Sequence, residues 1–348
     1  MHAIVHEDLK AVLESSIGWE SFRGKTVLVT GASGFLPAYM VETLLLLNEL
    51  TGTQCRVVCL VRNSANAEVR FRRYRLRNDL AFVQADVSEP IPDMDRCDFI
   101  IHAASQASPK YYSSDPVGTM TANLLGTDQL LRLARKWESE RFMFFSTGEV
   151  YGCVGADKVP TAESDYGYID ILNQRSCYAE SKRAAETLVV SYLQQFKVPG
   201  VIVRPFHTYG PGMKLDDGRV YADFVRDVVN RADIHMTSNG RAVRAFCYLS
   251  DAVAGFFTVL LKGISGQAYN VGNPDAAMSI QDLADMLVNL FPERACRVVR
   301  QAQLDEHYIP SPISINSPNI DRIGELGWRP HVSPLDGFRR TIQYYLET

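Results

Sequence analysis

The segment KTVLVTGASGFL, residues 25–36, decides the fold class of this chain. Residues 25–30 form a short β-branched run without apolar–polar alternation, which is typical of a strand buried on both faces of a parallel sheet. Gly31 and Gly34 follow as a turn, and residues 35–50 have the apolar spacing of a helix. Gly31 permits a tight turn and Gly34 lets the backbone approach a pyrophosphate at the helix N-terminus, so the segment predicts a dinucleotide site.

Strands and helices alternate beyond this turn. Strands are predicted at residues 55–61, 80–86, 98–104, 141–147 and 201–204, and helices at residues 116–137 and 177–196. This order predicts an α/β fold, a Rossmann doubly wound parallel sheet with helices on both faces. Ligands of such a sheet bind beyond the carboxyl ends of its strands.

The domain organisation follows from a change of pattern after residue 204, where prolines and glycines punctuate shorter elements. We expect a smaller C-terminal α/β substrate lobe over residues 205–348, interleaved with a late strand and helix of the main sheet near residues 246–272. Residues 23–204 are predicted to form the dinucleotide domain, and residues 1–22 an N-terminal helical extension.

Composition excludes several classes of function. The chain has 348 residues and a net charge of −4, so nucleic acid is not an expected partner. No apolar run approaches the roughly 18 residues of a membrane span, and no membrane association is expected. An odd number of scattered cysteines and an N-terminus unlike a signal peptide favour reduced thiols and a cytoplasmic location. No His/Cys cluster has zinc spacing, so no metal is expected.

The ends of the second and third predicted strands bear on the choice of dinucleotide. NAD sites often place an acidic residue after the second strand, whereas an arginine there can accommodate a 2′-phosphate. The chain has Arg62 at this position. We expect NAD as the cofactor and keep NADP as the alternative because of Arg62, which could instead be solvated or stacked on adenine. Asp86, at the end of the third strand, is placed to accept a hydrogen bond from the adenine amino group.

Tyr178 and Lys182 lie four residues apart on one face of a predicted helix. An ammonium beside a phenol stabilises the phenolate, so we expect the pKa of Tyr178 to be lowered. Such a tyrosine can take a proton from a substrate hydroxyl while hydride leaves for a nicotinamide. Ser146 and Thr147, at the end of the fifth predicted strand, add hydroxyls at the same edge of the sheet.

At this point the chain resembles the extended short-chain dehydrogenase/reductase superfamily, in its nucleotide-sugar branch. The matching pieces cover almost the whole chain in family order: TGASGF (30–35), AD (85–86), HAAS (102–105), STGEVYG (146–152), RSCYAESK (175–182), RPFHTYGPG (204–212), RAFCYLSD (244–251), YNVGNP (269–274) and GW (327–328). The resemblance implies a Rossmann NAD(P) domain and a lobe that binds a nucleoside-diphosphate sugar. It also implies Thr147, Tyr178 and Lys182 as a catalytic triad that oxidises sugar C4.

The resemblance assigns further residues one by one. At the cofactor it implies Gly31, Ser33, Gly34, Phe35, Leu36, Arg62, Asp86, Val87, Ala103, Ala104, Ser105, Asn123, Tyr178, Lys182 and Arg204. At the substrate it implies Ser105, Glu149, His207 and Arg244. It also implies a homodimer built through a four-helix bundle, with two helices near residues 118–136 and 178–196 from each subunit.

The reaction that follows oxidation is suggested by Thr147-Gly148-Glu149. The pattern in related 4,6-dehydratases is Thr-Asp-Glu, with the Asp as acid for a departing hydroxyl. UDP-glucuronate decarboxylases resemble Thr-Ser-Glu, and simple 4-epimerases usually carry no carboxylate there. Glu149 disfavours an epimerase, and Gly148 removes the acid unless a water beside it takes that role. Decarboxylation needs no such acid, so the leading prediction is a UDP-glucuronate decarboxylase-like enzyme with Glu149 as a fourth catalytic residue.

Other readings remain open. A 4,6-dehydratase and a 4-epimerase are the alternatives, and a non-catalytic dinucleotide-binding protein is a distant one. His207 and Asp223 stand where related enzymes often have asparagines near the nucleotide, and residues 316–320 lack an arginine that the family often carries before Pro-Asp-Ile. Either the nucleotide is not UDP or another residue compensates for these changes.

Overall fold

The computed structural model describes residues 1–300 and 313–348 and is organised around one seven-stranded sheet. Its strands are β1 (Thr26–Thr30), β2 (Arg56–Val61), β3 (Leu80–Gln84), β4 (Phe99–His102), β5 (Arg141–Phe145), β6 (Gly200–Pro205) and β11 (Ala268–Val271). They lie in the order β11-β6-β5-β4-β1-β2-β3, and every neighbouring pair is parallel. The predicted doubly wound sheet is confirmed, and its order reverses between β1 and β4, where such folds bind their ligands.

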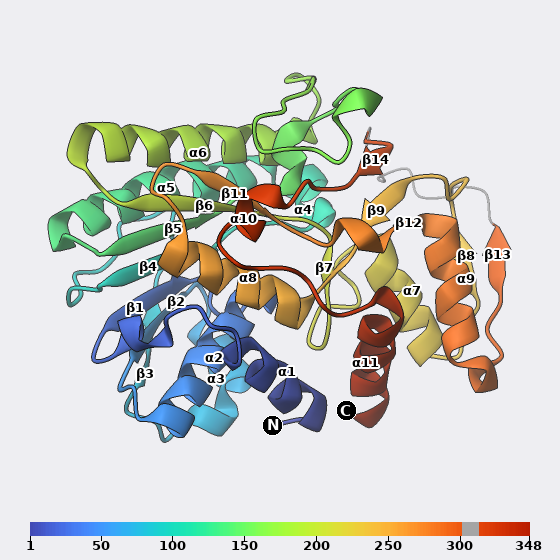
Figure 1. Ribbon diagram of the computed structural model, residues 1–348, viewed down its shortest axis with the longest axis horizontal. Helices are drawn as coiled ribbons and strands as arrows, with labels where there is room; N and C mark the ends of the chain where they lie inside the picture. Colours follow the sequence, from blue (N-terminus) through green and yellow to red (C-terminus); the bar gives the residue numbers. More distant parts are fainter. Residues whose placement is uncertain (301–312) are drawn as a thin grey trace.

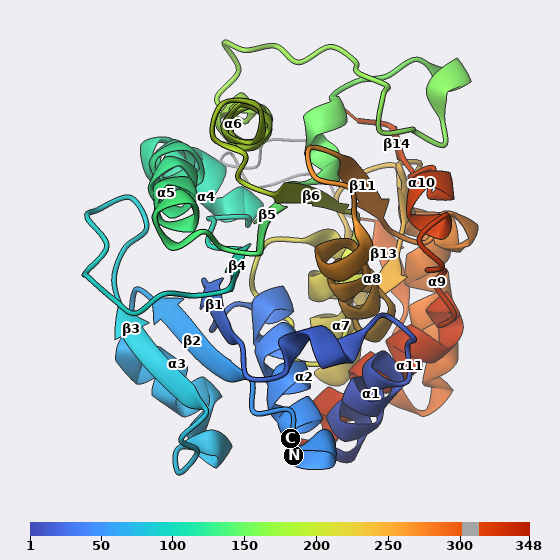
Figure 2. The same ribbon diagram turned by 60° about the vertical axis from the view of Figure 1, so that its left-hand side comes forward.

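Helices cover both faces of this sheet, as Figures 1 and 2 show. One face is covered by α2 (Phe35–Thr51), α3 (Ser64–Arg70) and α8 (Leu249–Lys262), the other by α5 (Pro116–Trp137) and α6 (Ser176–Phe196). Successive strand residues point to opposite faces. Val27 and Val29 of β1 accordingly enter one apolar cluster and Leu28 enters the other. This burial on both faces is why the strands carry no alternation in the sequence.

The N-terminal segment is packed into the protein rather than extending from it. It forms α1 (Ala3–Leu13) and the short helix η1 (Trp19–Phe22), and Leu9 and Val12 belong to the same core as α2 and α8. The buried carboxylate of Asp8 accepts hydrogen bonds from Tyr248 (2.8 Å) and Arg340 (2.7 Å). Because Arg340 lies on α11 (Pro334–Glu347), this contact joins the two ends of the chain, which lie close together in both views (Figures 1 and 2).

The smaller lobe lies beside the sheet (Figure 1) and has a core of its own. It contains α7 (Val220–Val229), α9 (Ile280–Leu290) and α11, with the short strands β7 (Thr208–Tyr209), β8 (Ile234–Met236), β9 (Val243–Ala245), β10 (Cys247–Tyr248), β12 (Ala277–Ser279), β13 (Val298–Arg300) and β14 (Ile315–Asn316). Between residues 246 and 272 the chain returns to the main sheet through α8 and β11, so the lobe is interleaved with it.

Short helical turns complete the fold. They are η2 (Arg72–Tyr74), α4 (Pro109–Ser114), η3 (Gly148–Tyr151), η4 (Ala156–Lys158), η5 (Pro274–Ala276), η6 (Pro292–Arg294) and α10 (Asp321–Gly324). Two of them, α4 and η3, follow β4 and β5 at the edge of the sheet where a ligand is expected. No helix in residues 1–300 or 313–348 is both long and apolar enough to cross a membrane.

Candidate active site

The glycine turn between β1 and α2 leaves no room for side chains. Gly31 has a φ of +63°, and a Cβ there would lie 2.8 Å from the Cα of Ala104. A Cβ on Gly34, the N-cap of α2, would lie 3.0 Å from the carbonyl oxygen of Gly31. Bare backbone therefore meets the N-terminus of α2, where free N–H groups favour an anion such as a pyrophosphate. Pro37 lies in the first turn of α2 without interrupting it, as expected.

Most residues predicted at the dinucleotide lie near this edge of the sheet, because they end or follow β1 to β4, begin α2 or lie on α5, whereas Tyr178 and Lys182 are on α6 and Arg204 is on β6. Buried side-chain atoms of Ser105, Asn123 and Ser146 find no hydrogen-bond partner in the described part of the chain. Asp86 accepts hydrogen bonds from the amide (2.9 Å) and hydroxyl (2.6 Å) of Ser88. Buried hydroxyl and amide groups usually have partners, so the unpartnered atoms of Ser105, Asn123 and Ser146 are available to a bound ligand.

Thr147, Tyr178 and Lys182 come together between β5 and α6. The ammonium of Lys182 donates to the carbonyl of Phe145 (2.6 Å) and lies 5.9 Å from the centroid of the Tyr178 ring. Thr147 follows β5 and forms a side-chain hydrogen bond with Tyr178. The sequence order of strand end and helix thus becomes a cluster of three polar side chains, all of them buried.

The electrostatics of this cluster differ from the sequence-based expectation. Burial raises the pKa of Tyr178 to about 12, although the bond with Thr147 and the charge of Arg219 oppose the rise. Burial also lowers the pKa of Lys182 to about 7, opposed by the charge of Glu186. The prediction of a lowered tyrosine pKa is therefore wrong for this structure, because desolvation outweighs the bond with Thr147 and the charge of Arg219. The Tyr178 phenol is protonated at neutral pH in the protein without ligand, and it must lose this proton before it can accept one from a substrate hydroxyl.

Two residues that the sequence analysis did not assign complete the surroundings of Tyr178. Tyr112, on α4, stacks on the Tyr178 ring with centroids 5.0 Å apart. The guanidinium of Arg175 lies 5.4 Å from the centroid of the Tyr112 ring and donates to Glu149 at 3.0 Å. Arg175 belongs to the RSCYAESK motif and was therefore visible in the sequence, whereas no sequence signal singled out Tyr112.

Gly148 lies against an aromatic ring. A Cβ at this position would lie 3.1 Å from Cε1 of Phe206 and 3.2 Å from its Cζ. Phe206 is itself buried and packs beside Tyr151, with ring centroids 6.1 Å apart. Phe206 therefore takes up space toward which a side chain at residue 148 would point, which counts against a water there that replaces a dehydratase acid.

Arg219 is a further cation at the site that the sequence analysis missed. Its guanidinium pairs with Asp217 (2.9 Å) and donates to the carbonyl of Ala107 (3.0 Å), in the loop between β4 and α4. Its positive charge acts on the pKa of Tyr178, so it lies within electrostatic reach of the phenol. It therefore links the start of α7 in the lobe to the loop beside the triad.

The two predicted substrate residues of the lobe, His207 and Arg244, differ in their hydrogen bonding. Nε2 of His207 is enclosed without a partner among the described residues, and burial holds the pKa of this imidazole well below its usual value. Arg244, on β9, donates to the backbone carbonyls of Val243, Ile313 and Ser314 at 2.8–3.1 Å. Those contacts tie β14 to β9, and the structure does not bring Arg244 into contact with the triad.

The replacements near the expected nucleotide are partly explained. Asp223 pairs with Arg226 one turn along α7, at 2.6 Å, so a neighbouring cation compensates for its charge. Asn316 lies opposite Arg244 in the β14–β9 register. The residues that precede this stretch, 301–312, lie outside the described part of the chain.

The prediction of a cofactor contact for Arg204 is corrected by the structure. Its five N–H groups are all engaged within the protein: they donate to both carboxylate oxygens of Glu186 (2.9 and 2.6 Å), to the hydroxyls of Tyr151 and Tyr166, and to the carbonyl of Glu163. The side chain is fully buried among these partners. Arg204 therefore holds β6, α6 and the loop after η3 together and has no donor left for a dinucleotide.

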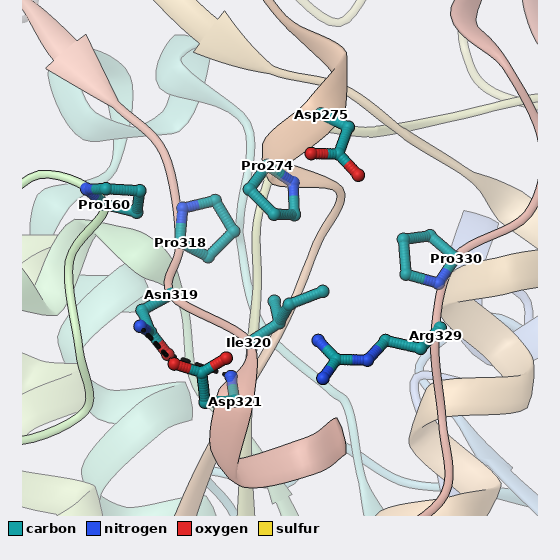
Figure 3. Close-up of a pocket in the computed structure, with 9 residues that line it drawn as sticks. All are labelled: Pro160, Pro274, Asp275, Pro318, Asn319, Ile320, Asp321, Arg329 and Pro330. Atoms are coloured by element: carbon teal, nitrogen blue, oxygen red, sulfur yellow. Dashed lines mark hydrogen bonds between the residues drawn. The ribbon is translucent and has the colours of Figure 1, made fainter.

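A separate pocket lies between the loop at Pro160, η5 and α10 (Figure 3). Four prolines line it together with Asp275, Asn319, Ile320, Asp321 and Arg329. Inside it Asn319 donates to Asp321 at 2.9 Å, and none of the predicted catalytic residues lines it.

Comparison with known proteins decides the family. Residues 27–272 match the model of the NAD dependent epimerase/dehydratase family. The chain belongs to this family. The resemblance found in the sequence motifs is therefore confirmed, and NAD is the cofactor.

Two curated relatives of this chain are UDP-glucuronic acid decarboxylases. The chain is 32% identical over 315 residues to UDP-glucuronic acid decarboxylase 6 of Arabidopsis thaliana, covering 89% of this chain and 86% of that protein. It is 31% identical over 324 residues to UDP-glucuronic acid decarboxylase 1 of Danio rerio, covering 92% of this chain and 72% of that protein.

Solved structures of the family show the same fold. UDP-glucose 4-epimerase of Thermotoga maritima matches with a TM-score of 0.77 and 21% identity, covering 92% of this chain and 99% of that one. The dTDP-glucose 4,6-dehydratase of Streptomyces venezuelae, solved with NAD, matches with a TM-score of 0.76 and 24% identity, covering 92% and 97%. At these identities the likeness extends to the fold alone.

Residues 1–300 and 313–348 contain no group of three or more His, Cys, Asp or Glu side chains placed to hold a metal ion.

Proposed function

We propose that this enzyme oxidises C4 of a nucleoside-diphosphate sugar with a C6 carboxylate and then releases that carboxylate as CO2. The observation that carries the proposal is the pair Glu149 and Gly148: a carboxylate is present, but Phe206 occupies the place where a leaving-group acid would stand. Loss of hydroxide without an acid is hard, whereas a sugar with a ketone at C4 and a carboxylate at C6 is a β-keto acid, which loses CO2 without one. The names of the curated relatives support the same activity.

The proposed roles follow from the contacts. NAD held at the glycine turn between β1 and α2 would supply the hydride acceptor for C4 and the donor for its return. Tyr178, held by Thr147 and beside Lys182, exchanges the proton of the C4 hydroxyl. Glu149 pairs with Arg175 at 3.0 Å, and it passes the proton to C5 that this carbon takes up. After CO2 leaves, C5 takes up one proton from solvent, so the net reaction is sugar carboxylate plus H+ giving sugar C–H plus CO2.

We propose another residue than Arg244 as the cation that attracts the sugar carboxylate. Sequence comparison suggested Arg244, whose guanidinium is bonded to backbone carbonyls of β9 and of residues 313 and 314. Arg219 acts electrostatically on Tyr178 and bridges Asp217 and Ala107 beside the triad. We therefore assign the attraction of an anionic sugar to Arg219 together with Arg175.

Mass spectrometry of nucleotide sugars incubated with the purified protein tests the proposal. UDP-glucuronate and the common UDP-, dTDP-, GDP- and CDP-hexoses are each supplied with NAD+ or NADP+. We expect loss of CO2 from UDP-glucuronate only. Tyr178→Phe should abolish turnover while NAD binding persists.

Loss of water from a neutral hexose would instead indicate a 4,6-dehydratase. An unchanged mass with an inverted C4 in the NMR spectrum would indicate a 4-epimerase, and no reaction of any sugar would indicate a dinucleotide-binding protein.

We further propose a homodimer that buries the outer face of α5 and α6. A shallow apolar groove there is lined by Leu124, Ala184, Thr187, Leu188 and Ser191, and Leu125 is half exposed beside it. Light scattering after gel filtration should give twice the monomer mass, and Leu188→Glu should give a monomer with an unchanged circular-dichroism spectrum. A monomeric wild type would overturn this assembly.

A reducing, cytoplasmic location fits the cysteines. Six of them are buried thiols, at positions 55, 59, 97, 177, 247 and 296, and burial raises the pKa of Cys55 to about 12. Such thiols resist oxidation and metal binding, so they serve as small apolar residues. Fractionation of the source cells would test the location.

A further inference from the structure

The segment between α3 and β3 has a high density of positive charge. Residues 70–77 read RFRRYRLR, so five of these eight residues are arginines in a chain whose net charge is −4. They form the end of α3, the short helix η2 and the turn that follows it. Basic runs of this length are contact points for anionic partners, and none of the residues predicted at the cofactor or the substrate lies in this one.

Two aromatic side chains fix one side of the segment to the sheet. Phe71 and Tyr74 are buried, and the Phe71 ring lies 5.9 Å from the ring of Phe82 on β3. They are three residues apart, which is one turn of a 3₁₀ helix, so both point inward. Arg77 continues this inward side and pairs with Asp79 at 2.6 Å. The backbone of the segment is therefore held firmly in place.

The other two sides of this turn face the solvent. By the same three-residue spacing, Arg72 and Arg75 lie on one side, and Arg73 and Leu76 lie on the other. All four side chains are exposed, Leu76 by 87%. Arg73 lies over the Tyr74 ring at 4.7 Å, which orients its guanidinium. No carboxylate in the described part of the chain forms an ion pair with any of the three arginines, so their charges are available to an outside partner.

We call this surface the arginine ridge: Arg72, Arg73, Arg75 and Leu76, together with Val69, which is 72% exposed at the end of α3. The ridge leads to the amino end of β3, whereas the ligand crevice lies beyond the carboxyl ends of the strands. Figure 2 shows α3 beside β2 and β3, and α5 and α6 cover the opposite face of the sheet. A partner on the ridge would therefore cover neither the crevice nor the outer face of α5 and α6.

The chemistry of the ridge narrows the class of partner. Guanidinium groups bind carboxylates through paired, charge-assisted hydrogen bonds. Single-stranded nucleic acid is bound on exposed aromatic rings, but both aromatic rings of this segment are buried. Recognition of anionic lipids by basic clusters takes about four to eight cationic side chains, and the ridge presents fewer. Exposed leucine and valine beside the arginines favour a partner that also carries an apolar side chain.

We propose that the arginine ridge binds a short acidic segment of a partner protein, in which carboxylates are interspersed with an apolar side chain. The arginines pair with the carboxylates, and Leu76 and Val69 contact the apolar side chain. Residues 69–76 span about 12 Å at the rise of such helices, which an extended segment of about four residues matches. This binding is independent of the proposed decarboxylation, so either proposal can fail without the other.

Fluorescence anisotropy of a labelled hexapeptide of glutamate and leucine, added to the full-length protein, tests the proposal. Wild type should bind this peptide, less tightly as the salt concentration rises, and should not bind a hexapeptide of lysine and leucine. Arg72→Gln/Arg73→Gln/Arg75→Gln should bind the acidic peptide about tenfold more weakly, because three exposed ion pairs are lost together. Leu76→Ser should bind it about threefold more weakly, because apolar contact is lost.

The matched control is Arg23→Gln/Arg231→Gln/Arg241→Gln. It removes the same charge from three exposed arginines that form no ion pair among the described residues and lie outside the ridge. This control should bind the acidic peptide within about twofold of wild type. All variants should keep the wild-type circular-dichroism spectrum, and if the triple ridge variant does not fold, Leu76→Ser remains as the test.

Several results would overturn the proposal. These are no binding of the acidic peptide by wild type, an equal loss of affinity in the control, or full affinity in both ridge variants. Tighter binding of phosphatidylserine vesicles or of polyuridylate than of the peptide, lost in the triple ridge variant, would also overturn it and would assign the ridge to a membrane surface or to RNA.

Discussion

The ring of Tyr112 stacks on the ring of Tyr178, with 5.0 Å between centroids and 19° between planes. Tyr112 lies on α4, in the connection from β4 to α5, whereas Tyr178 lies on α6. The Tyr112 hydroxyl donates to the carbonyl of Ala107 at 3.1 Å, which anchors the ring from the far side. The plane of the Tyr178 phenol is thus held by a residue distant in sequence, and its hydroxyl is kept beside Thr147.

Removing this stack should reduce turnover without weakening substrate binding to the same extent. An offset aromatic pair contributes about 0.5–1.5 kcal/mol, so we expect Tyr112→Ala to lower kcat by up to about tenfold. Tyr112→Phe retains the ring and should keep kcat within about twofold of wild type. Steady-state kinetics on both variants tests this. An equal loss in the two variants would assign the effect to the hydroxyl instead of the stack.

The contact between Gly148 and Phe206 predicts a packing penalty. A methyl group at 148 must displace a ring 3.1 Å away, so Gly148→Ala should lower the free energy of unfolding by about 1–3 kcal/mol. Gly148→Ala/Phe206→Leu should recover part of that loss, because the smaller side chain opens the space. Urea unfolding measures the unfolding free energies of the single and the double variant. If the double variant is no more stable than the sum of the single changes predicts, the two residues do not compete for the same space.

The buried ion pair of Arg204 and Glu186 predicts a large stability effect. Glu186→Gln keeps the shape but leaves the buried guanidinium without its counter-charge, which should cost about 3–5 kcal/mol of unfolding free energy. The control is Arg132→Gln, which breaks an exposed pair with Asp128 and should cost less than about 0.5 kcal/mol. Urea unfolding at neutral pH distinguishes the two. A small effect of Glu186→Gln would mean that Arg204 is compensated by its other acceptors.

The pKa of Lys182 predicts how stability depends on pH. Burial lowers it from 10.5 to about 7 in the folded protein. Between these values the unfolded chain binds more protons than the folded one, so this group makes the unfolding free energy rise with pH. The penalty on the charged form is complete below pH 7 and absent above pH 10.5.

Comparison of wild type with Lys182→Met isolates that contribution, because the other titrating groups are shared. The stability of wild type relative to the variant should increase by about 2 kcal/mol between pH 7 and pH 9. Urea unfolding of the protein without added nucleotide at the two pH values measures the change. A constant difference would show that Lys182 titrates near its usual pKa.

The elements that sequence reasoning predicted well are those with strong local signals. The helix predicted at residues 116–137 is α5, Pro116–Trp137: the Asp115 carboxylate caps its N-terminus and Glu138 ends it in a left-handed conformation. Its neighbour α4 was not predicted, since residues 109–114 have no apolar periodicity. That helix begins at a proline, and its one buried side chain is Tyr112. Tertiary stacking, which no local pattern reveals, decides its place.

The sequence predicted which residues come together at the site better than it predicted their pKa values. The Tyr178–Lys182 spacing places both residues on one helix face, but it says nothing of how much water reaches them. Burial then reversed the expected direction of the tyrosine pKa. The same limit applies to Arg204, whose motif is visible in the sequence while its five hydrogen-bond acceptors belong to four residues distant from it in sequence.

The choice between NAD and NADP depends on Arg62 and Asp86. The Arg62 side chain is 61% exposed, and its guanidinium lies 4.0 Å from the Asp86 carboxylate, a loose pair that leaves most of its N–H groups to solvent. An exposed guanidinium attracts a 2′-phosphate, whereas with NAD it can only stack on adenine or stay in solvent.

Arg62→Ala should therefore weaken the binding of NADP+ by about tenfold or more and the binding of NAD+ by less than about threefold. Titrations with each dinucleotide measure both effects, and raising the salt concentration should diminish NADP+ binding to wild type more than to the variant. An equal loss for the two dinucleotides would mean that Arg62 acts on the adenine they share.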